Sequence, residues 1–285
     1  MVKSRCEFLE KEFVMDKSLK NVKLFLFDMD GTLYLGNILY DFTIELLNTI
    51  KENGSRYLFM TNNSSKSVNA YIEKLEKLGI KADKDDFITS SQATAYYLKN
   101  HHKNATLYVC GTQSLKDEFI SEGFKVSENI DEVNCIVMGN DTELTFKKLW
   151  DVSYLLTVKP DMPYVATNID YVCPTEFGFV PDCGSFCDMI FNATGKRPVF
   201  IGKPEALMPE LAMAMTGYSK EQTAVIGDRI YTDIKSGINA GIVSMLVMSG
   251  ETTEEILNAS ADKPDIVLEN AGEILGILKQ QRPRC

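Results

Sequence analysis

Four short apolar runs, each followed at once by polar residues, stand out in the hydrophobic pattern of this chain. They occupy residues 23–27, 56–60, 198–202 and 223–226. Continuous apolar runs of this length are typical of strands that are buried on both faces of a parallel sheet. Ligands of open α/β sheets bind beyond the carboxyl ends of such strands. We therefore expect the four strands to lie in one sheet, with the polar residues that follow them at one edge.

Helical patterns alternate with the first strands. Residues 41–53 and 66–78 repeat apolar positions at helical spacing, and each stretch ends at a glycine, Gly54 or Gly79. This alternation predicts an α/β fold whose core is a doubly wound, mainly parallel sheet of the Rossmann-like kind. Pro209 falls inside a later helical pattern, so that helix is expected to kink or to begin late.

The interval between residues 61 and 203 is too long for a crossover within one sheet. It contains strand-like and helical runs of its own, at residues 106–110, 134–138, 164–166, 114–121 and 144–158. We therefore predict an inserted α/β domain at residues 92–181, between a first core segment, 1–91, and a second, 182–285. Residues 1–21 form an extra leading segment to which no role is assigned.

Carboxylate, hydroxyl, amide and ammonium groups follow the four strands. The first run leads into Asp28-Met29-Asp30-Gly31-Thr32, with two carboxylates one residue apart. Close carboxylates repel unless a cation offsets their charge, and Mg²⁺ is a natural choice because it prefers oxygen ligands. The groups after the other strands are Thr61, Asn62, Lys203, Asp228 and Asp233. Together they suit phosphoryl transfer, which needs a nucleophile, a metal and donors for the phosphate oxygens.

These segments, in this order, resemble the four motifs of the haloacid dehalogenase superfamily of phosphatases. The matching positions are Asp28 to Thr32, then Thr61, then Lys203, and last Gly227-Asp228 with Asp233. The resemblance runs from about residue 22 to about residue 270. The forms around Thr61 and Lys203 are similar to the branch that includes 4-nitrophenyl phosphatases, nucleotide and sugar phosphatases, and phosphoglycolate phosphatases. That branch carries a large cap inserted between the second and third motifs, so the resemblance implies that the inserted domain at residues 92–181 is a cap domain.

The resemblance implies a role for each matched carboxylate. Asp28 would be the nucleophile, and Asp30 would protonate the leaving oxygen and later take a proton from the hydrolytic water. Mg²⁺ would be bound by Asp28, the main-chain carbonyl of Asp30, and Asp228. Asp233 would orient Lys203 or metal-bound water. The alternative for Asp228 and Asp233 is that they only cap a helix over residues 232–240.

A second group of residues would bind the phosphoryl oxygens: Gly31, Thr61, Asn62 and Lys203. Thr61 could instead cap a helix that starts near residue 65, which is compatible with phosphate binding at the same helix end. Lys203 alone could be an ordinary exposed lysine. In the cap, Asn168 and Asp170 belong to a loop that could contact the substrate, and a plain turn is the alternative.

Composition limits the partners. The net charge of −10 disfavours binding to nucleic acid or to an anionic membrane through bulk electrostatics. No apolar run approaches the roughly 20 residues that span a bilayer, and residues 1–21 lack the apolar core of a signal peptide. We therefore expect a cytoplasmic protein. The seven cysteines are sparse and odd in number, which predicts free thiols, with Cys110 and Cys135 buried in strands.

The sequence therefore predicts a Mg²⁺-dependent phosphate-monoester hydrolase that acts on small phosphorylated metabolites through an aspartyl-phosphate. The substrate is expected to be a sugar phosphate, a nucleoside monophosphate or a phosphoglycolate-like ester, with 4-nitrophenyl phosphate as an artificial substrate. A homodimer formed through the cap is the protein partner that the resemblance suggests. The alternative functions are a non-catalytic phosphate-ester binding protein and an interaction protein that docks through its cap.

Overall fold

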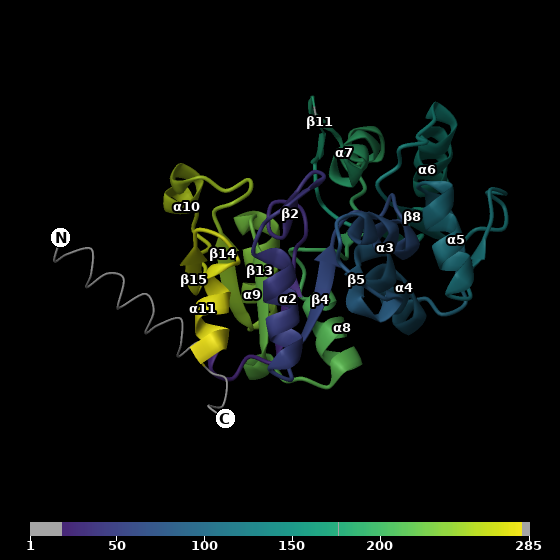
Figure 1. Ribbon diagram of the computed structural model, residues 1–285. Coiled ribbons are helices and arrows are strands. Elements are labelled where there is room, and N and C mark those ends of the chain that lie inside the picture. Colours follow the sequence, from purple (N-terminus) through teal and green to yellow (C-terminus); the bar gives the residue numbers. More distant parts are fainter. Residues whose placement is uncertain (1–18, 176, 281–285) are drawn as a thin grey trace. The chain divides into compact units, whose positions relative to one another are not determined.

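The computed structural model describes residues 19–175 and 177–280 of the chain (Figure 1). Most of the predicted leading segment, residues 1–18, lies outside the described residues. The chain divides into two compact units. The first comprises Met1–Met60, Leu75–Phe87 and Pro209–Cys285, and the second comprises Thr61–Lys74 and Ile88–Met208. The predicted domain limits stay a prediction; the second unit holds residues 92–181 together with residues on both sides of them.

A six-stranded sheet forms the centre of the first unit, in the order β15-β14-β13-β1-β4-β5. In chain order its strands are β1 (Leu24–Phe27), β4 (Arg56–Thr61), β5 (Phe87–Thr89), β13 (Thr223–Gly227), β14 (Val243–Val247) and β15 (Ile266–Leu268). β1 pairs in parallel with both β13 and β4, and β14 and β15 continue the parallel pairing beyond β13. The chain runs outward from β1 on one side and returns to β13 on the other. This reversal makes the β1–β13 boundary the switch point at which open α/β sheets bind ligands.

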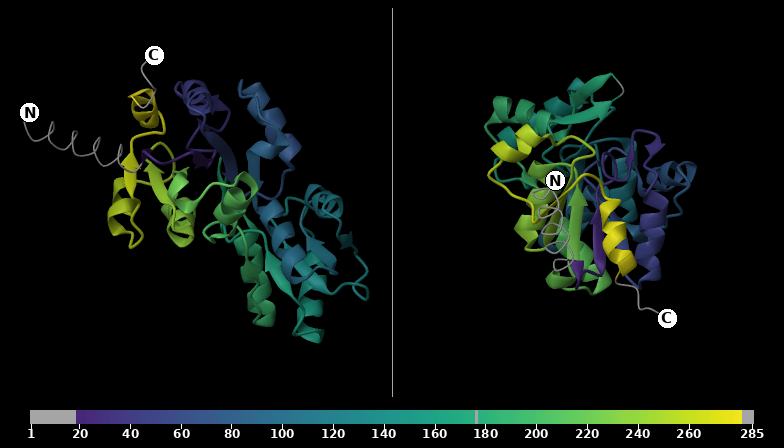
Figure 2. Two further views of the ribbon diagram at one scale, coloured as in Figure 1. Left: turned by 90° about the horizontal axis from the view of Figure 1, so that it is seen from below. Right: turned by 60° about the vertical axis from the view of Figure 1, so that its left-hand side comes forward.

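Burial explains why these runs form strands. All residues of β1 and β13 are buried, as expected for parallel strands that are covered on both faces. Helices α2 (Thr43–Glu52) and α11 (Glu273–Gln280) contact each other on one face, and α9 (Lys235–Ala240) packs against β13 and β14 on the other (Figure 2, left). α2 buries Leu46, Leu47 and Ile50, the face that its apolar spacing predicts. The predicted α/β fold with a mainly parallel sheet is confirmed.

A five-stranded parallel sheet forms the centre of the second unit, in the order β12-β9-β8-β6-β7. Its strands are β6 (Thr106–Cys110), β7 (Lys125–Val126), β8 (Cys135–Met138), β9 (Tyr164–Ala166) and β12 (Val199–Phe200). The helices of this unit include α4 (Ser90–His101), α5 (Gln113–Ser121), α6 (Phe146–Val158) and α7 (Cys183–Thr194). Met138, Leu155 and Ile190 join β8, α6 and α7 in one buried core. The strands and helices predicted between residues 106 and 166 are confirmed, with small shifts at their ends.

One expectation is wrong: the strand predicted at residues 198–202 does not join the sheet of the other three. It shortens to β12 and pairs with β9, with Val199 beside Val165 and Phe200 beside Ala166. Val199 is 51% exposed, because β12 is an edge strand of its sheet. The apolar run indicates a strand, but it carries no information about which of two sheets that strand joins.

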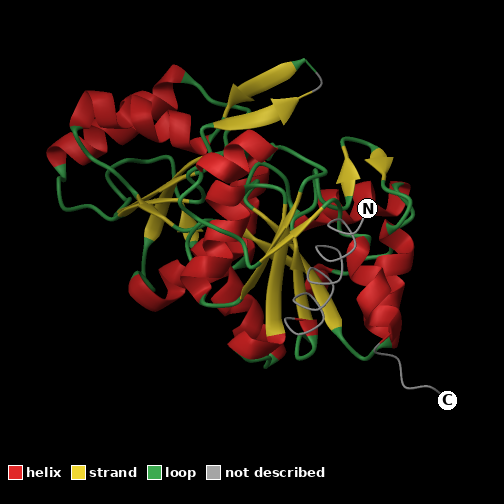
Figure 3. Cartoon of the chain, turned by 90° about the vertical axis from the view of Figure 1, so that its left-hand side faces the viewer, coloured by secondary structure: helices red, strands yellow, loops and turns green. Residues whose placement is uncertain are grey.

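Short elements complete the described chain. Antiparallel ribbons are formed by β2 (Tyr34–Leu35) with β3 (Ile38–Leu39) and by β10 (Val172–Thr175) with β11 (Gly178–Pro181) (Figure 3). The remaining α-helices of the described residues are α3 (Val68–Lys77), α8 (Leu207–Thr216) and α10 (Glu254–Ala259). Pro209 lies in the first turn of α8, where its missing N–H removes no helical hydrogen bond, so the predicted late start is confirmed.

Two further predictions concern membranes and cysteines. No helix of the described chain has the length and apolarity to cross a bilayer. Cys110 and Cys135 are buried free thiols, as predicted. Cys183 and Cys187 are also free thiols, while Cys6 and Cys285 lie outside the described residues.

Candidate active site

The first motif places two carboxylates in different environments. Asp28 follows β1 directly, and its N–H donates to the carbonyl of Ile226 in the neighbouring strand at 2.8 Å. The chain then turns sharply, and Gly31 takes a φ of +87°, a conformation that favours glycine. Asp28 is half-buried, whereas Asp30 is exposed and accepts a hydrogen bond from the N–H of Gly36 at 3.2 Å. The turn therefore gives different surroundings to two acids that are separated by a single residue in the motif.

Asp228 directly follows β13, and a single π-helical turn, Ile230–Ile234, carries Asp233. The N–H groups of both Asp233 and Ile234 donate to the carbonyl of Arg229. Asp233 is fully buried and accepts a hydrogen bond from the N–H of Arg229 at 3.1 Å. A Cβ at position 227 would collide with the Asp233 side chain, so Gly227 is required for this close approach. The alternative that these acids only cap a helix does not account for their burial.

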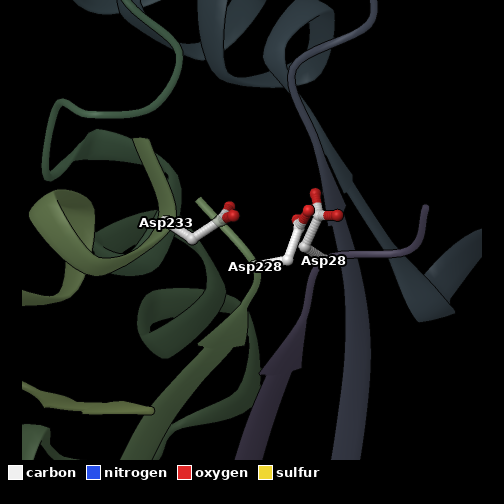
Figure 4. Close-up of side chains that lie close together, drawn as sticks. All are labelled: Asp28, Asp228 and Asp233. Atoms are coloured by element: carbon white, nitrogen blue, oxygen red, sulfur yellow. The ribbon is translucent and has the colours of Figure 1, made fainter. Parts of the chain in front are cut away.

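Asp28, Asp228 and Asp233 form one cluster in the first unit (Figure 4). Each offers a carboxylate oxygen, and these oxygens lie within 4.8 Å of one another. Asp228 Oδ2 accepts a hydrogen bond from the N–H of Glu251 at 2.7 Å. Its Oδ1 is buried and has no hydrogen-bond partner in the described part of the chain. A buried carboxylate oxygen without a donor, facing other carboxylates, is the arrangement that a hard divalent cation satisfies.

The electrostatics of the cluster also favours a bound cation. Burial, together with the charges of Asp28 and Asp233, raises the pKa of Asp228 to about 7, from an ordinary value of 3.8. Arg229 lies next to the cluster and pairs with Glu251, Nε to Oε2, at 2.8 Å. Burial alone would lower the pKa of Arg229, but the surrounding negative groups outweigh it and raise that pKa. One arginine therefore offsets only part of the negative charge.

The remaining predicted residues of the second and third motifs lie in the second unit. Thr61 is the last residue of β4, and its Oγ1 accepts a hydrogen bond from the N–H of Asn63 at 3.3 Å. It does not cap a helix, because α3 begins only at Val68. Lys203 is 3% exposed, so the alternative of an ordinary exposed lysine is wrong.

Asn62 connects these loops. Its side-chain Nδ2 donates to Asp170 Oδ2 at 3.0 Å and to the carbonyl of Lys203 at 2.9 Å. Asn168, which is fully buried, donates from its Nδ2 to the carbonyl of Asn62 at 2.9 Å. The Asn168 Oδ1 also accepts from the N–H of Asp170 at 3.0 Å. The segment 168–170 is therefore more than a plain turn, because it is bonded to the loop that follows β4.

The structure thus brings the predicted residues together in two sets: Asp28, Asp228 and Asp233 in the first unit, and Asn62, Asn168, Asp170 and Lys203 in the second. Two neighbours were not predicted. Arg229 directly follows Asp228 in the fourth motif. Ser90 donates from its Oγ to the carbonyl of Asn62 at 2.6 Å. Ser90 follows the apolar strand β5, so the pattern of an apolar run followed by polar residues could have identified it.

Comparison with known proteins identifies the family. A model described as haloacid dehalogenase-like hydrolase matches residues 25–125, and a second, described as HAD-hydrolase-like, matches residues 200–274. The chain is 35% identical over 256 residues to the 5'-nucleotidase YutF of Bacillus subtilis, which covers 90% of this chain and 98% of that protein. The chain belongs to the haloacid dehalogenase-like hydrolases. The predicted family is therefore confirmed.

Other members of the haloacid dehalogenase-like hydrolases give the same assignment. An acid sugar phosphatase of Staphylococcus epidermidis is 34% identical over 246 residues, which cover 86% of this chain and 94% of that protein. The crystal structure of a 4-nitrophenylphosphatase from Thermotoga maritima matches with a TM-score of 0.85 and 38% identity, covering 92% of this chain and 98% of that one. Both names fall within the branch that the sequence resembles.

Proposed function

We propose that this protein is a Mg²⁺-dependent phosphate-monoester hydrolase that acts through an aspartyl-phosphate. The observation that carries the proposal is the cluster of Asp28, Asp228 and Asp233, in which Asp228 Oδ1 is buried without a donor. The enzyme class, phosphoric monoester hydrolase, is the one that the named relatives share. Two of the three clustered carboxylates follow the strands β1 and β13, at the switch point of the sheet.

The residues of the cluster fit a divalent cation. Asp28, Asp228 and the main-chain carbonyl of Asp30 would hold Mg²⁺, with Asp233 as a supporting carboxylate. When bound, the ion supplies positive charge that offsets the repulsion between a carboxylate nucleophile and a phosphate ester. Three carboxylates and one arginine leave net negative charge at the cluster, and this also favours a cation.

The chemistry itself belongs to Asp28 and Asp30. A carboxylate oxygen of Asp28 attacks phosphorus, and the bond between phosphorus and the leaving oxygen breaks. Asp30 donates the proton that the leaving oxygen needs. Water then attacks the aspartyl-phosphate, Asp30 takes a proton from that water, and inorganic phosphate leaves with Asp28 restored. The exposure of Asp30 suits a group that exchanges protons with a substrate and with water.

Phosphoryl oxygens would be bound by Gly31, Thr61 and Lys203. A buried lysine is a strong ligand for a dianion, because little water competes for its charge. The names of the relatives favour nucleoside monophosphates and sugar phosphates as substrates.

The test is a screen over phosphorylated metabolites and 4-nitrophenyl phosphate, with Mg²⁺, for wild type and Asp28→Asn. Turnover by wild type and none by a folded Asp28→Asn protein is the expected result. Turnover of comparable rate in both proteins would rule out Asp28 as the nucleophile. No turnover of any ester by wild type would instead favour the binding-protein alternative.

We also propose a homodimer formed through the second unit. Helix α6 exposes Phe146, Trp150 and Tyr154, four residues apart, at 75%, 64% and 48%. They line an apolar cavity of about 520 Å³ together with Met189 of α7. Exposed apolar patches of this kind are common in protein interfaces. A light-scattering mass twice that of the chain is expected, and a monomeric mass at micromolar concentration would contradict the proposal.

A further inference from the structure

Asn62 makes five hydrogen bonds through its side chain and main chain to residues that are distant in the sequence. Its Nδ2 donates to Asp170 and to the carbonyl of Lys203 at 3.0 and 2.9 Å, and its Oδ1 accepts from the N–H of Lys203 at 2.7 Å. One carboxamide therefore bonds both main-chain polar groups of Lys203. Because the Lys203 N–H can only donate and its carbonyl can only accept, these partners fix which side-chain atom of Asn62 is oxygen.

The main-chain carbonyl of Asn62 is held as firmly as the side chain. It accepts hydrogen bonds from Asn168 Nδ2 at 2.9 Å and from Ser90 Oγ at 2.6 Å. We call Asn62, Ser90, Asn168, Asp170 and Lys203 the Asn62 network. Asn62, Asn168 and Lys203 are each no more than 6% exposed. The network therefore lies away from water, where the loss of a single donor leaves a costly unpaired group.

Gly202, the residue before Lys203, permits the contact between Asn62 and the Lys203 main chain. A Cβ at position 202 would lie 2.6 Å from Asn62 Oδ1 and 2.6 Å from the carbonyl of Thr167. Gly202 therefore allows the Lys203 main chain to reach the carboxamide. The Gly202 N–H also donates to that Thr167 carbonyl at 2.8 Å.

A carboxamide has two N–H donors and one carbonyl oxygen. Both donors of Asn62 are directed to protein acceptors, and the oxygen is directed to the Lys203 N–H. The side chain of Asn62 thus has no N–H left for a phosphoryl oxygen. This differs from the role of phosphate ligand expected for Asn62 from the sequence.

We propose that Asn62 is a positioning residue, whose carboxamide fixes the main chain of Lys203 and the carboxylate of Asp170 relative to the loop that follows β4. The inference rests on the proposed function, because it is through Lys203 and Thr61 that the network acts on a bound phosphoryl group. Fixing both main-chain groups of Lys203 restricts the motion of that residue to its own side chain. The ammonium group is then held ready for a phosphoryl oxygen, with less order to be gained when substrate binds.

The decisive experiment is a double-mutant cycle between positions 62 and 203. It measures kcat and KM for 4-nitrophenyl phosphate, and the affinity for inorganic phosphate, in wild type, Asn62→Ala, Lys203→Ala and the double variant. If Asn62 acts through Lys203, Asn62→Ala lowers kcat/KM on the order of 100-fold. The double variant is then no worse than Lys203→Ala, within about threefold. Losses that multiply across the two sites would overturn the inference and make Asn62 an independent ligand.

A matched control separates positioning from general loss of stability. Asn140 is also buried in the second unit; its Nδ2 donates to Asp182 Oδ2 at 3.0 Å, and its N–H donates to Ser64 Oγ at 3.0 Å. Asn140→Ala is expected to lower the melting temperature about as much as Asn62→Ala while leaving kcat/KM within about threefold. An equal loss of kcat/KM in both variants would attribute the effect of Asn62 to stability and overturn the inference.

A second test exchanges the hydrogen-bond donor and acceptor between positions 62 and 170. It also applies if Asn62→Ala fails to fold. Asn62→Asp keeps the acceptor for the Lys203 N–H but loses both donors, and it places two carboxylates together at Asp170. Adding Asp170→Asn returns a donor to that contact, so the double variant is expected to recover part of the kcat/KM and melting temperature lost by Asn62→Asp. No recovery of either would overturn the contact with Asp170.

The two proposals fail in different ways. If wild type hydrolyses no phosphate ester, the proposed function fails, and the melting temperatures of the Asn62→Asp and Asp170→Asn cycle still decide the network. If wild type is active and the effects at positions 62 and 203 multiply, only the positioning role fails.

Discussion

Replacing Asp228 with asparagine should stabilise the metal-free protein, although Asp228 is part of the proposed metal site. In the structure the carboxylate is buried, lies with Asp28 and Asp233, and has one oxygen without a donor. An asparagine at this position would be isosteric: its oxygen can still accept from the N–H of Glu251, and its amide can donate towards the other carboxylates. The substitution therefore removes repulsion and adds a donor where one is missing.

The size of the expected stabilisation follows from the proton affinity of Asp228. Its pKa is raised to about 7 from 3.8, and a tenfold change in proton affinity corresponds to about 1.4 kcal/mol. Because the folded pKa is the higher one, protonation stabilises the fold; this contribution is complete below the unfolded pKa and is lost as the pH rises through the folded pKa. Well above pH 7 the ionised group should cost the metal-free fold on the order of 2–4 kcal/mol. This corresponds to roughly 5–15 °C in melting temperature.

The assay is thermal and denaturant unfolding of EDTA-treated wild type and Asp228→Asn at about pH 8.5 and about pH 5. The variant should be the more stable at the higher pH, and its advantage should fall to less than half at the lower. Mg²⁺ should stabilise wild type only, by about 2.7 kcal/mol at 100 times its dissociation constant. Asp141, a buried acid paired with Lys148 at 2.8 Å, provides the control, and Asp141→Asn should destabilise the protein. A metal-free Asp228→Asn protein that is less stable than wild type at the higher pH would refute this reasoning.

Three further predictions concern catalysis. Asp30→Asn should reduce turnover of esters with poor leaving groups much more than turnover of 4-nitrophenyl phosphate, since a good leaving group needs less protonation; equal losses measured in kcat for both kinds of ester would contradict a role as general acid. Activity should disappear with excess EDTA and return with Mg²⁺ but return poorly with Ca²⁺, whose larger coordination shell misplaces the nucleophile; full activity after exhaustive chelation would exclude a metal. Tyr171, which is 52% exposed, should affect the ranking of substrates, whereas Asp170→Ala should lower kcat/KM for all of them by a similar factor through Asn62. A metabolite panel measured with Tyr171→Ala and Asp170→Ala decides this, and an unchanged ranking in the Tyr171 variant would place specificity elsewhere.

The fold of the first unit could largely be predicted from local sequence. The run before Asp28 is apolar throughout, and β1 is buried at every residue. Gly54 and Gly79 end their helices with φ values of +69° and +85°, a conformation that glycine adopts without steric cost. These features depend on a few neighbouring residues, so the sequence pattern contains the information needed.

The site was predictable only in part. The strand-end positions of Asp28 and Asp228 suggested that they meet, and β1 and β13 are indeed neighbours with Phe27 beside Ile226. The sheet of β12 was predicted wrongly, because an apolar run specifies a strand and not its partner. The hydrogen-bond partners of Asn62 were likewise beyond the sequence, since they lie on loops that are far apart in the chain.

By itself the sequence determined which residue types are present at the candidate site and which strands and turns carry them. It also determined the family to which the chain belongs. Tertiary structure alone decided that Asp228 is buried with one oxygen lacking a donor, that Lys203 is buried, and that the Asn62 side chain is hydrogen-bonded to the Lys203 main chain and to Asp170. The physical reason is that the two kinds of property depend on different parts of the chain. Strand and turn preferences arise from steric and solvation effects over a few residues, whereas burial, pKa and hydrogen-bond saturation depend on every group that packing brings within a few ångströms.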